Sequence, residues 1–242
     1  MGDGANVNNK KIKARNLMPE IKYVGNNASV ERQKIISFFN LHKKGKLTVT
    51  VSDITRAIEY EINSLKFNQE NINNQLKFLV SLYCPDPFFK DVVETKEEIA
   101  IWQPSFEFSL EIPEEGIEMG YRESSLIVNV FNEGAVESGM TIKFKALATV
   151  ENPSLFNVNT REYFKINRTM EAGEVITVTT HFQNKRVQLN KGGVISNAFN
   201  WIDLDSAFLQ LDIGDNLLRY DASLGLSNLE VDIYHSPQYL GV

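Results

Sequence analysis

Histidine and cysteine supply most nucleophiles, general bases and zinc ligands, and both are rare in this 242-residue chain. His42, His181 and His235 lie far apart, and none has a partner at the short spacing that zinc sites use. The single Cys84 excludes an internal disulfide and follows an apolar stretch, with no neighbouring base. We therefore expect Cys84 to be a buried structural thiol rather than a nucleophile.

Acidic side chains offer one group that could form a site: Asp203, Asp205, Asp212 and Asp215. Converging carboxylates could bind calcium, but these four lack the spacing of an EF-hand loop. Aspartates beside serine and glycine suit hydrogen-bonded turns equally well, and we favour that interpretation. The chain has no G-x-S-x-G, H-E-x-x-H or glycine-rich phosphate-binding motif. The sequence thus predicts no catalytic, metal-binding or cofactor-binding residue, and no enzyme.

Aromatic residues permit two interpretations. Trp102, Trp201, Phe199 and Phe208 could line a groove that stacks against sugars, but a β-sandwich core needs the same residues. Core packing is the favoured use. A carbohydrate-binding module that recognises cell-wall glycan is kept as the alternative function, and a glycan-degrading enzyme with a carboxylate such as Asp203 is a weaker one.

Charge is distributed unevenly along the chain. Residues 1–96 contain 15 Lys/Arg and 10 Asp/Glu, whereas residues 97–242 contain 10 and 21. Such asymmetry is typical of two modules with different neighbours. The basic excess is small and interrupted by acids, which argues against specific nucleic-acid binding. No apolar run approaches the ~18 residues that cross a bilayer, and the N-terminus lacks the apolar core of a secretory signal.

The N-terminal part mixes strand and helix signals. Residues 17–23 predict a strand, and residues 29–39 predict a helix capped by Ser29, with Ile35, Ile36, Phe38 and Phe39 on its apolar side. The run 43–46 is expected to be a solvated turn. Residues 47–51 and 56–62 alternate in period two across Ser52-Asp53 and predict a hairpin, and residues 74–82 predict a further strand.

A proline-containing segment, Cys84-Pro85-Asp86-Pro87, stiffens the chain before a polar stretch at 90–98, where we expect the domain boundary. Beyond it, short strands separated by Gly or Asn turns predict an antiparallel sandwich. They are expected at 106–110, 124–132, 140–148, 163–166, 175–181, 187–189, 207–211, 217–220 and 229–234.

An ordered set of short motifs runs through the whole chain. In the N-terminal part the motifs are Asp3-Gly4, Glu31-Arg32-Gln33-Lys34-Ile35, Phe38-Phe39-Asn40 and Ser81-Leu82-Tyr83-Cys84-Pro85-Asp86-Pro87-Phe88-Phe89. In the C-terminal part they are Phe131-Asn132-Glu133-Gly134, Glu137-Ser138-Gly139, Glu162-Tyr163-Phe164-Lys165-Ile166-Asn167, Asn197-Ala198-Phe199-Asn200, Leu204-Asp205-Ser206, Gly214-Asp215-Asn216 and Tyr239-Leu240-Gly241-Val242. Each is weak alone, but in this order they resemble the siphophage distal tail protein family.

This resemblance implies a mainly β protein of a bacteriophage or prophage tail tip, made in the host bacterial cytoplasm. Residues 1–98 would form a β-rich, split-barrel-like domain with one helix, and residues 99–235 a galectin-like antiparallel β-sandwich. Residues 236–242 would return to the N-terminal domain, as in some relatives. The implied partners are five further copies in a hexameric ring, the tail tube protein, the tail-associated hub protein and receptor-binding or adhesion proteins.

Two further expectations concern the ring. Relatives usually carry some tens of residues, including a first strand pair, before the Asp-Gly segment found here at Asp3-Gly4, so the resemblance implies that those strands are lacking and puts ring formation in doubt. A closed ring needs two different patches on each subunit. Unpaired strand edges recruit neighbouring chains, and the hairpin within residues 47–62 is the candidate.

Overall fold

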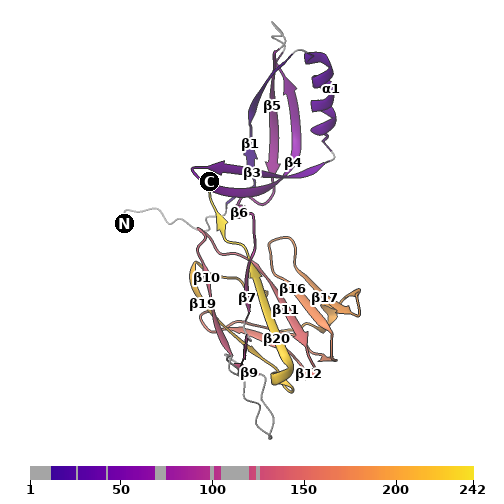
Figure 1. The fold of residues 1–242 in the computed structure, drawn as a ribbon, viewed down its shortest axis with the longest axis vertical. Helices are drawn as coiled ribbons and strands as arrows, with labels where there is room; N and C mark the ends of the chain where they lie inside the picture. Colours follow the sequence, from indigo (N-terminus) through magenta and orange to yellow (C-terminus); the bar gives the residue numbers. More distant parts are fainter. Residues whose placement is uncertain are drawn as a thin grey trace, which may run out of the picture. The chain divides into compact units, whose positions relative to one another are not determined.

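The computed structural model describes residues 12–25, 27–41, 43–68, 75–98, 101–104, 120–123 and 126–242, the two short segments 101–104 and 120–123 by their backbone alone. Asp3-Gly4, His42, the side chain of Trp102 and the predicted strand 106–110 lie outside this description. The chain divides into two compact units, Met1–Val92 with Tyr239–Val242, and Val93–Gln238 (Figure 1). They differ by a few residues from the proposed domains 1–98, 99–235 and 236–242. No helix in the described part is long and apolar enough to cross a membrane.

The N-terminal unit is one antiparallel sheet with a helix against one face (Figure 1). Its elements are β1 (Arg15–Leu17), β2 (Glu20–Val24), α1 (Ala28–Phe38), β3 (Lys44–Val51), β4 (Ile54–Phe67), β5 (Gln75–Cys84) and β6 (Phe89–Asp91), joined by β21 (Gln238–Tyr239). β5 pairs with β1, β2 and β4, whereas β3 pairs with β4. The predicted hairpin is confirmed and is longer at both ends.

The C-terminal unit is a sandwich of two main sheets. The four-stranded sheet has the order β10 (Ile127–Asn132), β19 (Gly214–Asp221), β13 (Ser154–Asn157) and β14 (Tyr163–Lys165). The six-stranded sheet has the order β18 (Val194–Asn197), β17 (Arg186–Lys191), β16 (Val175–Thr179), β11 (Met140–Ala146), β20 (Leu229–His235) and β7 (Thr95–Glu98). Two-stranded pairs are β12 (Val150–Glu151) with β15 (Thr169–Met170), and β8 (Ile101–Pro104) with β9 (Gly120–Glu123). The short 3-10 helices η1 (Phe199–Trp201) and η2 (Leu226–Asn228) lie in connections.

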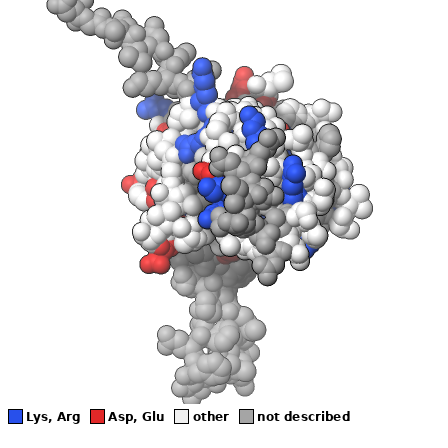
Figure 2. Space-filling view, turned by 90° about the horizontal axis from the view of Figure 1, so that it is seen from above, with Lys and Arg blue, Asp and Glu red and all other residues white. Residues whose placement is uncertain are grey.

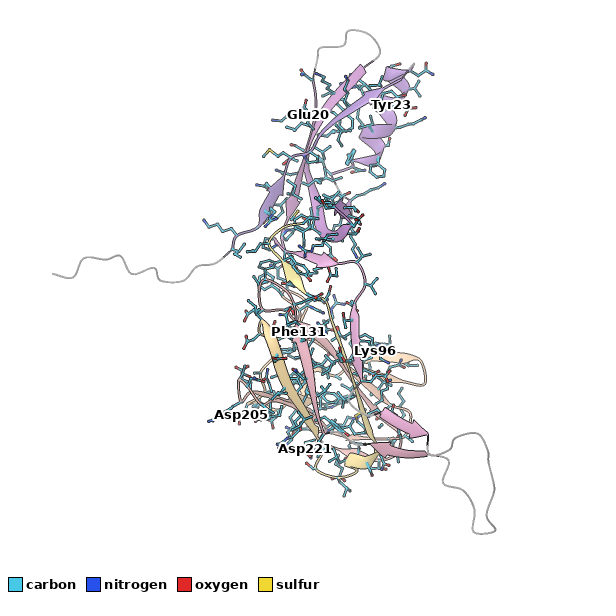
Figure 3. The ribbon with its side chains drawn as sticks, turned by 60° about the vertical axis from the view of Figure 1, so that its left-hand side comes forward. Glu20, Tyr23, Lys96, Phe131, Asp205 and Asp221 are labelled. Atoms are coloured by element: carbon cyan, nitrogen blue, oxygen red, sulfur yellow. The ribbon has the colours of Figure 1, made fainter. Side chains whose placement is uncertain are left out.

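Along the strands of the sandwich, buried residues alternate with more exposed ones, and the buried residues form the core. β11 buries every second residue, from Met140 through Phe144, and β19 likewise buries Leu218 and Tyr220. The buried side chains of β11 lie beside those of β16 and β20 in the six-stranded sheet, and they pack with those of β19 from the four-stranded sheet in one core. Figure 3 draws the side chains of this unit as sticks. Removal of this apolar surface from water drives the fold. The expected mainly β architecture is confirmed; the galectin-like form of the sandwich stays a prediction.

Several sequence predictions need correction. The helix begins at Ala28, so Ser29 lies inside it and does not cap it; Asn27 holds the cap position and forms no side-chain cap bond. Ile35 and Phe39 pack against the sheet, but Ile36 and Phe38 are exposed, because the sheet covers only one side of the helix. Lys44–Lys46 begin β3 rather than forming a turn. The predicted strand 17–23 is split at Pro19, and residues 207–211 form only a single bridge, from Leu211 to Ser138.

Candidate assembly surfaces

The outer edge of β3 is an unpaired backbone edge among the described strands of the N-terminal unit. β3 pairs with β4 along its whole length, and among the described strands its other edge has no partner. Leu47 and Val49 point toward the core, so Lys46, Thr48 and Thr50 line the opposite, exposed face. An unpaired edge of eight residues is long enough to accept a strand from another chain.

Positive charge accompanies this edge. Lys43, Lys44 and Lys46 lie within four residues, and all three are exposed. Lys44 forms an ion pair with Glu61 on the neighbouring strand at 2.5 Å, and this contact raises the pKa of Lys44. Figure 2 shows Lys and Arg side chains over the middle of the upper face, with Asp and Glu mainly at its rim. The edge therefore favours a partner surface with negative charge.

The tip of the hairpin adds a small apolar surface. Val51 and Ile54 flank the turn and are each 49% exposed. Ser52 and Asp53 both have positive φ, the backbone form of a tight hairpin turn, and the hydroxyls of Thr50 and Thr55 lie 2.9 Å apart beneath it. The tip is held in one conformation by these contacts, so it can act as a rigid docking feature.

The chain end forms a second surface of the N-terminal unit. Tyr239 and Val242 pack beside the buried Ile58, Cys84 and Phe89. Burial raises the pKa of the Cys84 thiol, which keeps it protonated and unreactive. The hydroxyl of Tyr239 donates to the Asp91 carboxylate at 3.2 Å. The final residues thus belong to the core of this unit, and the sequence signal for this was only the motif resemblance.

The aspartates do not come together as a metal site. Asp203 accepts bonds from the side chains of Asn167 (2.9 Å) and Tyr163 (3.2 Å) and from the backbone N–H of Asp205 (3.1 Å). The bond from Asn167 is the main cause that lowers the pKa of Asp203. Asp205 itself lies on a peripheral loop (Figure 3). In the described part of the chain, no three His, Cys, Asp or Glu side chains form a group that could hold a metal ion.

The remaining two aspartates surround a buried amide. The side chain of Asn216 accepts from the backbone N–H of Asp212 at 2.9 Å and donates to the carbonyl of the same residue at 2.8 Å. Asp215 accepts from Asn129 at 2.6 Å. Asp203 and Asp205 act as turn residues, as favoured from sequence. The predicted turn at Gly214-Asp215-Asn216 is wrong, because these residues begin β19, where Asp215 pairs with Phe131 and Asn216 pairs with Val130.

The aromatic candidates are only partly exposed. Trp201 is half-buried against the sandwich core, and the Arg168 guanidinium lies 4.0 Å from its ring centroid. Phe199 stacks on Phe208 with 6.0 Å between centroids, and Phe208 packs on the buried Phe164. Arg168 therefore covers one face of the half-buried Trp201 ring, while Phe199 is 45% exposed.

The histidines also differ in their surroundings. His235 is buried, and burial lowers its pKa; within the described residues neither ring nitrogen has a hydrogen-bond partner. His181 lies 3.5 Å from the Thr141 hydroxyl through Nε2. These two residues are not neighbours in any ligand cluster of the described chain.

Comparison with known proteins finds one family model and several solved structures that are similar to this chain. Residues 133–239 match the siphovirus-type tail component, C-terminal domain. The crystal structure of the Dit protein of phage SPP1, presented as a paradigm of hub adsorption apparatus in phages that infect Gram-positive bacteria, is similar with a TM-score of 0.68 and 14% identity. That similarity covers 98% of this chain and 84% of the SPP1 chain. A chain of the activated phage P2 baseplate with Ca has a TM-score of 0.55 and 11% identity, over 94% and 80% of the two chains.

No curated protein has a significantly matching sequence. The solved structures are so distant in sequence that they establish the fold alone. Together with the match of residues 133–239, this fold confirms the resemblance to siphophage distal tail proteins.

Proposed function

Because residues 133–239 belong to the siphovirus-type tail component family, we propose that the chain is a structural subunit of a bacteriophage or prophage tail tip. That family match is the observation that carries the proposal. The subunit forms a hexameric ring that joins the tail tube protein to the tail-associated hub protein and to adhesion proteins. It resides in the virion and is made in the host cytoplasm. It performs no catalysis and binds no cofactor.

The ring closes through the free edge of β3. A heterologous interface needs a second patch that differs from the first. The outer edge of β2 supplies it, since β2 pairs only with β5 among the described strands. Its exposed face carries both Glu20 and Lys22, and Glu20 is the group that can pair with Lys46 of the neighbouring subunit. Edge pairing of this kind aligns backbone donors and acceptors, and charge selects the orientation over distances below about 10 Å.

Mass photometry at micromolar concentration tests the ring. We expect a species of about six times the 27.5 kDa chain mass. The double variant Lys43→Glu/Lys46→Glu should shift the protein toward monomer, because it reverses charge along the β3 edge. Lys34→Glu/Lys66→Glu makes the same charge change at exposed positions of α1 and β4, outside the β3 and β2 edges, and should leave the ring intact. A wild-type chain that is monomeric at all concentrations would contradict the ring.

A carbohydrate-binding function is not supported by the side chain of Trp201, which Arg168 covers. The described aromatic residues therefore favour core packing and contact with proteins over stacking on sugars. Titration with cell-wall fragments, monitored by intrinsic tryptophan fluorescence, should give no saturable change. Saturable quenching would instead favour the glycan-binding alternative.

A further inference from the structure

The β18 strand forms a free edge in the C-terminal unit. It ends the six-stranded sheet, pairs with β17 from Gln188↔Asn197 to Lys191↔Val194, and has no second partner among the described strands. All four of its residues are exposed. Natural edge strands are commonly blocked by a charged residue, a proline or a bulge. Val194-Ile195-Ser196-Asn197 contains no proline and no charge, so this edge is open to pairing.

The edge is held in place before any partner arrives. The β17–β18 turn uses Gly192 and Gly193, both with positive φ, and the N–H of Gly193 donates to the Asn190 side chain at 2.9 Å. At the other end, the buried Ala198 donates its N–H to the carbonyl of Val187 at 2.9 Å. A partner strand therefore meets an ordered template, which lowers the entropic cost of binding.

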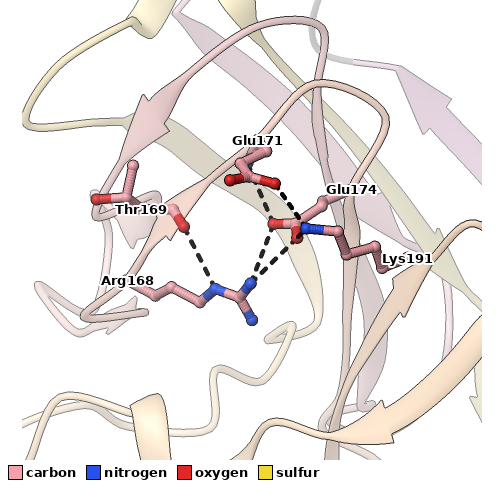
Figure 4. Close-up of polar contacts among 5 residues, drawn as sticks. All are labelled: Arg168, Thr169, Glu171, Glu174 and Lys191. Carbon is pink, nitrogen blue, oxygen red and sulfur yellow. Dashed lines mark hydrogen bonds and ion pairs between the residues drawn. The ribbon is translucent and has the colours of Figure 1, made fainter.

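The turn end of the hairpin is fixed by charge as well. Lys191, the last residue of β17, contacts Glu171 at 2.6 Å and the buried Glu174 at 3.1 Å (Figure 4). Arg168 pairs with the same Glu174 carboxylate. This network ties β17 to the turn that precedes β16, so β18 projects from a rigid support.

The segment that contains this edge is more basic than the unit as a whole. Residues 175–202 contain Lys185, Arg186 and Lys191 and no Asp or Glu, whereas residues 97–242 contain 21 acids and 10 Lys/Arg. Lys191 is paired with Glu171 and Glu174, so the positive charge available to a partner is that of Lys185 and Arg186. Arg186 is exposed on β17, and Lys185 lies 5.0 Å from the Phe208 ring centroid. A segment with negative charge is therefore attracted to this edge and repelled from most of the remaining surface.

Exposed apolar side chains supply the second recognition element. Val194 is 71% exposed and Ile195 is 63% exposed, and as neighbours in a strand they point to opposite faces. Phe182 and Phe199 are also exposed in the segments that flank the β17–β18 hairpin. An added strand with alternating apolar residues would cover these side chains while it pairs with the β18 backbone.

From these features we propose that β18 binds an extended, acidic segment of a partner protein, which adds to the six-stranded sheet as a further strand. The partner is thus defined by its chemistry: alternating apolar and acidic residues in an unfolded or terminal stretch. The inference uses only the C-terminal unit and is independent of whether the N-terminal unit closes a ring.

The test uses the full chain and a fluorescent peptide of about seven residues in which Val alternates with Asp or Glu. Fluorescence anisotropy should show saturable binding that weakens as NaCl is raised, and no binding of a matched peptide in which Lys replaces the acids. Ile195→Glu should weaken binding at least about tenfold, because it adds repulsion at the edge. Ile213→Glu, at another exposed apolar position of the same unit, should bind like the wild type.

Thermal melts of both variants check that the sandwich is intact. Equal binding by the two variants, or no binding by the wild type, would overturn the proposal. Light scattering of the chain alone tests whether a second copy of the chain binds β18 instead. Concentration-dependent association that Ile195→Glu abolishes would assign the edge to a second copy, and it would overturn the proposal of an acidic partner segment. Ring formation is tested separately, by mass photometry of the Lys43→Glu/Lys46→Glu variant. Failure of the ring and failure of peptide binding at β18 can therefore be distinguished.

Discussion

The guanidinium of Arg56 lies 3.3 Å from the centroid of the Tyr239 ring, so a residue of the β4 strand stacks on the end of the chain. Arg56 also donates to the carbonyl of Gly241 at 2.5 Å, and Arg15 donates to the carbonyl of Leu240 at 2.7 Å. Two arginines thus hold the last four residues against the N-terminal sheet. The N-terminal unit thus contains both the first and the last segment of the chain, and the C-terminal unit is formed by the residues between them.

Arg56→Ala should lower the free energy of unfolding of the N-terminal unit by about 1–3 kcal/mol, since it removes a cation–π contact and a charge-assisted hydrogen bond. Hydrogen exchange of the β6 amides, which pair with β4 beside Arg56, measures the effect. Lys66→Ala, at an exposed position of the same strand, is the control and should change exchange little. Unchanged protection in Arg56→Ala would show that the chain end is not held by this residue.

Glu174 organises the polar cluster of the C-terminal unit (Figure 4). Its side chain is almost fully buried and accepts from the N–H of Glu171 at 3.1 Å, in addition to its pairs with Arg168 and Lys191. Burial by itself would raise the pKa of Glu174, but the backbone bond and the two cations outweigh it, and the pKa is lowered. The stabilisation is therefore present above the unfolded pKa of about 4.3 and is lost as the pH falls through the lower folded value.

Glu174→Gln should lower the free energy of unfolding by about 2–3 kcal/mol at pH 7. The loss is smaller than for the breaking of a fully buried ion pair, because Lys191 is more than half exposed. Chemical denaturation at pH 7 and near pH 3 measures it, and the difference from wild type should shrink at the lower pH. Glu171→Gln, whose side chain is largely exposed, should cost much less. A pH-independent difference would mean that Glu174 contributes by shape rather than charge.

Asn216 should be among the least replaceable polar residues of the sandwich. Its buried amide bonds the backbone of Asp212 and also donates to the carbonyls of Gly214 (3.0 Å) and Val130 (3.3 Å). Asn216→Ala should cost about 2–4 kcal/mol, because it leaves several buried backbone groups without partners. Urea denaturation measures the loss. Asn184→Ala, at an exposed position in the same unit, should stay within about 0.5 kcal/mol of wild type.

His235 should make stability depend on pH. Burial lowers its pKa, although the nearby Glu97 and Glu133 act in the opposite direction. The unfolded chain takes up a proton near pH 6.5 while the folded chain stays neutral, so stability falls as the pH drops below that value toward the folded pKa. His235→Phe should flatten the melting temperature between about pH 6.5 and pH 5. An identical slope in wild type and variant would assign the dependence to other groups.

Much of the fold was predictable because local patterns are strong in strands. The 44–67 hairpin, the strand β5 and the strands β11, β16, β19 and β20 all follow period-two alternation that one buried face imposes. Several short strands were missed, although β14 (Tyr163–Lys165) was predicted at 163–166. β18 has no buried residue at all, so no alternation could reveal it, and β13 and β15 are too brief to show a period.

The sequence by itself determined the β class, the absence of familiar catalytic motifs and the turn roles of residues such as Asp203, because these depend on neighbours along the chain. Only the tertiary structure decided which edges stay unpaired. Whether β3 and β18 have one partner or two depends on strands distant in sequence, and so does the place of Tyr239 beneath Arg56. Which strands pair is a collective property of the folded sheet, and the local alternation that marks a buried face does not encode it.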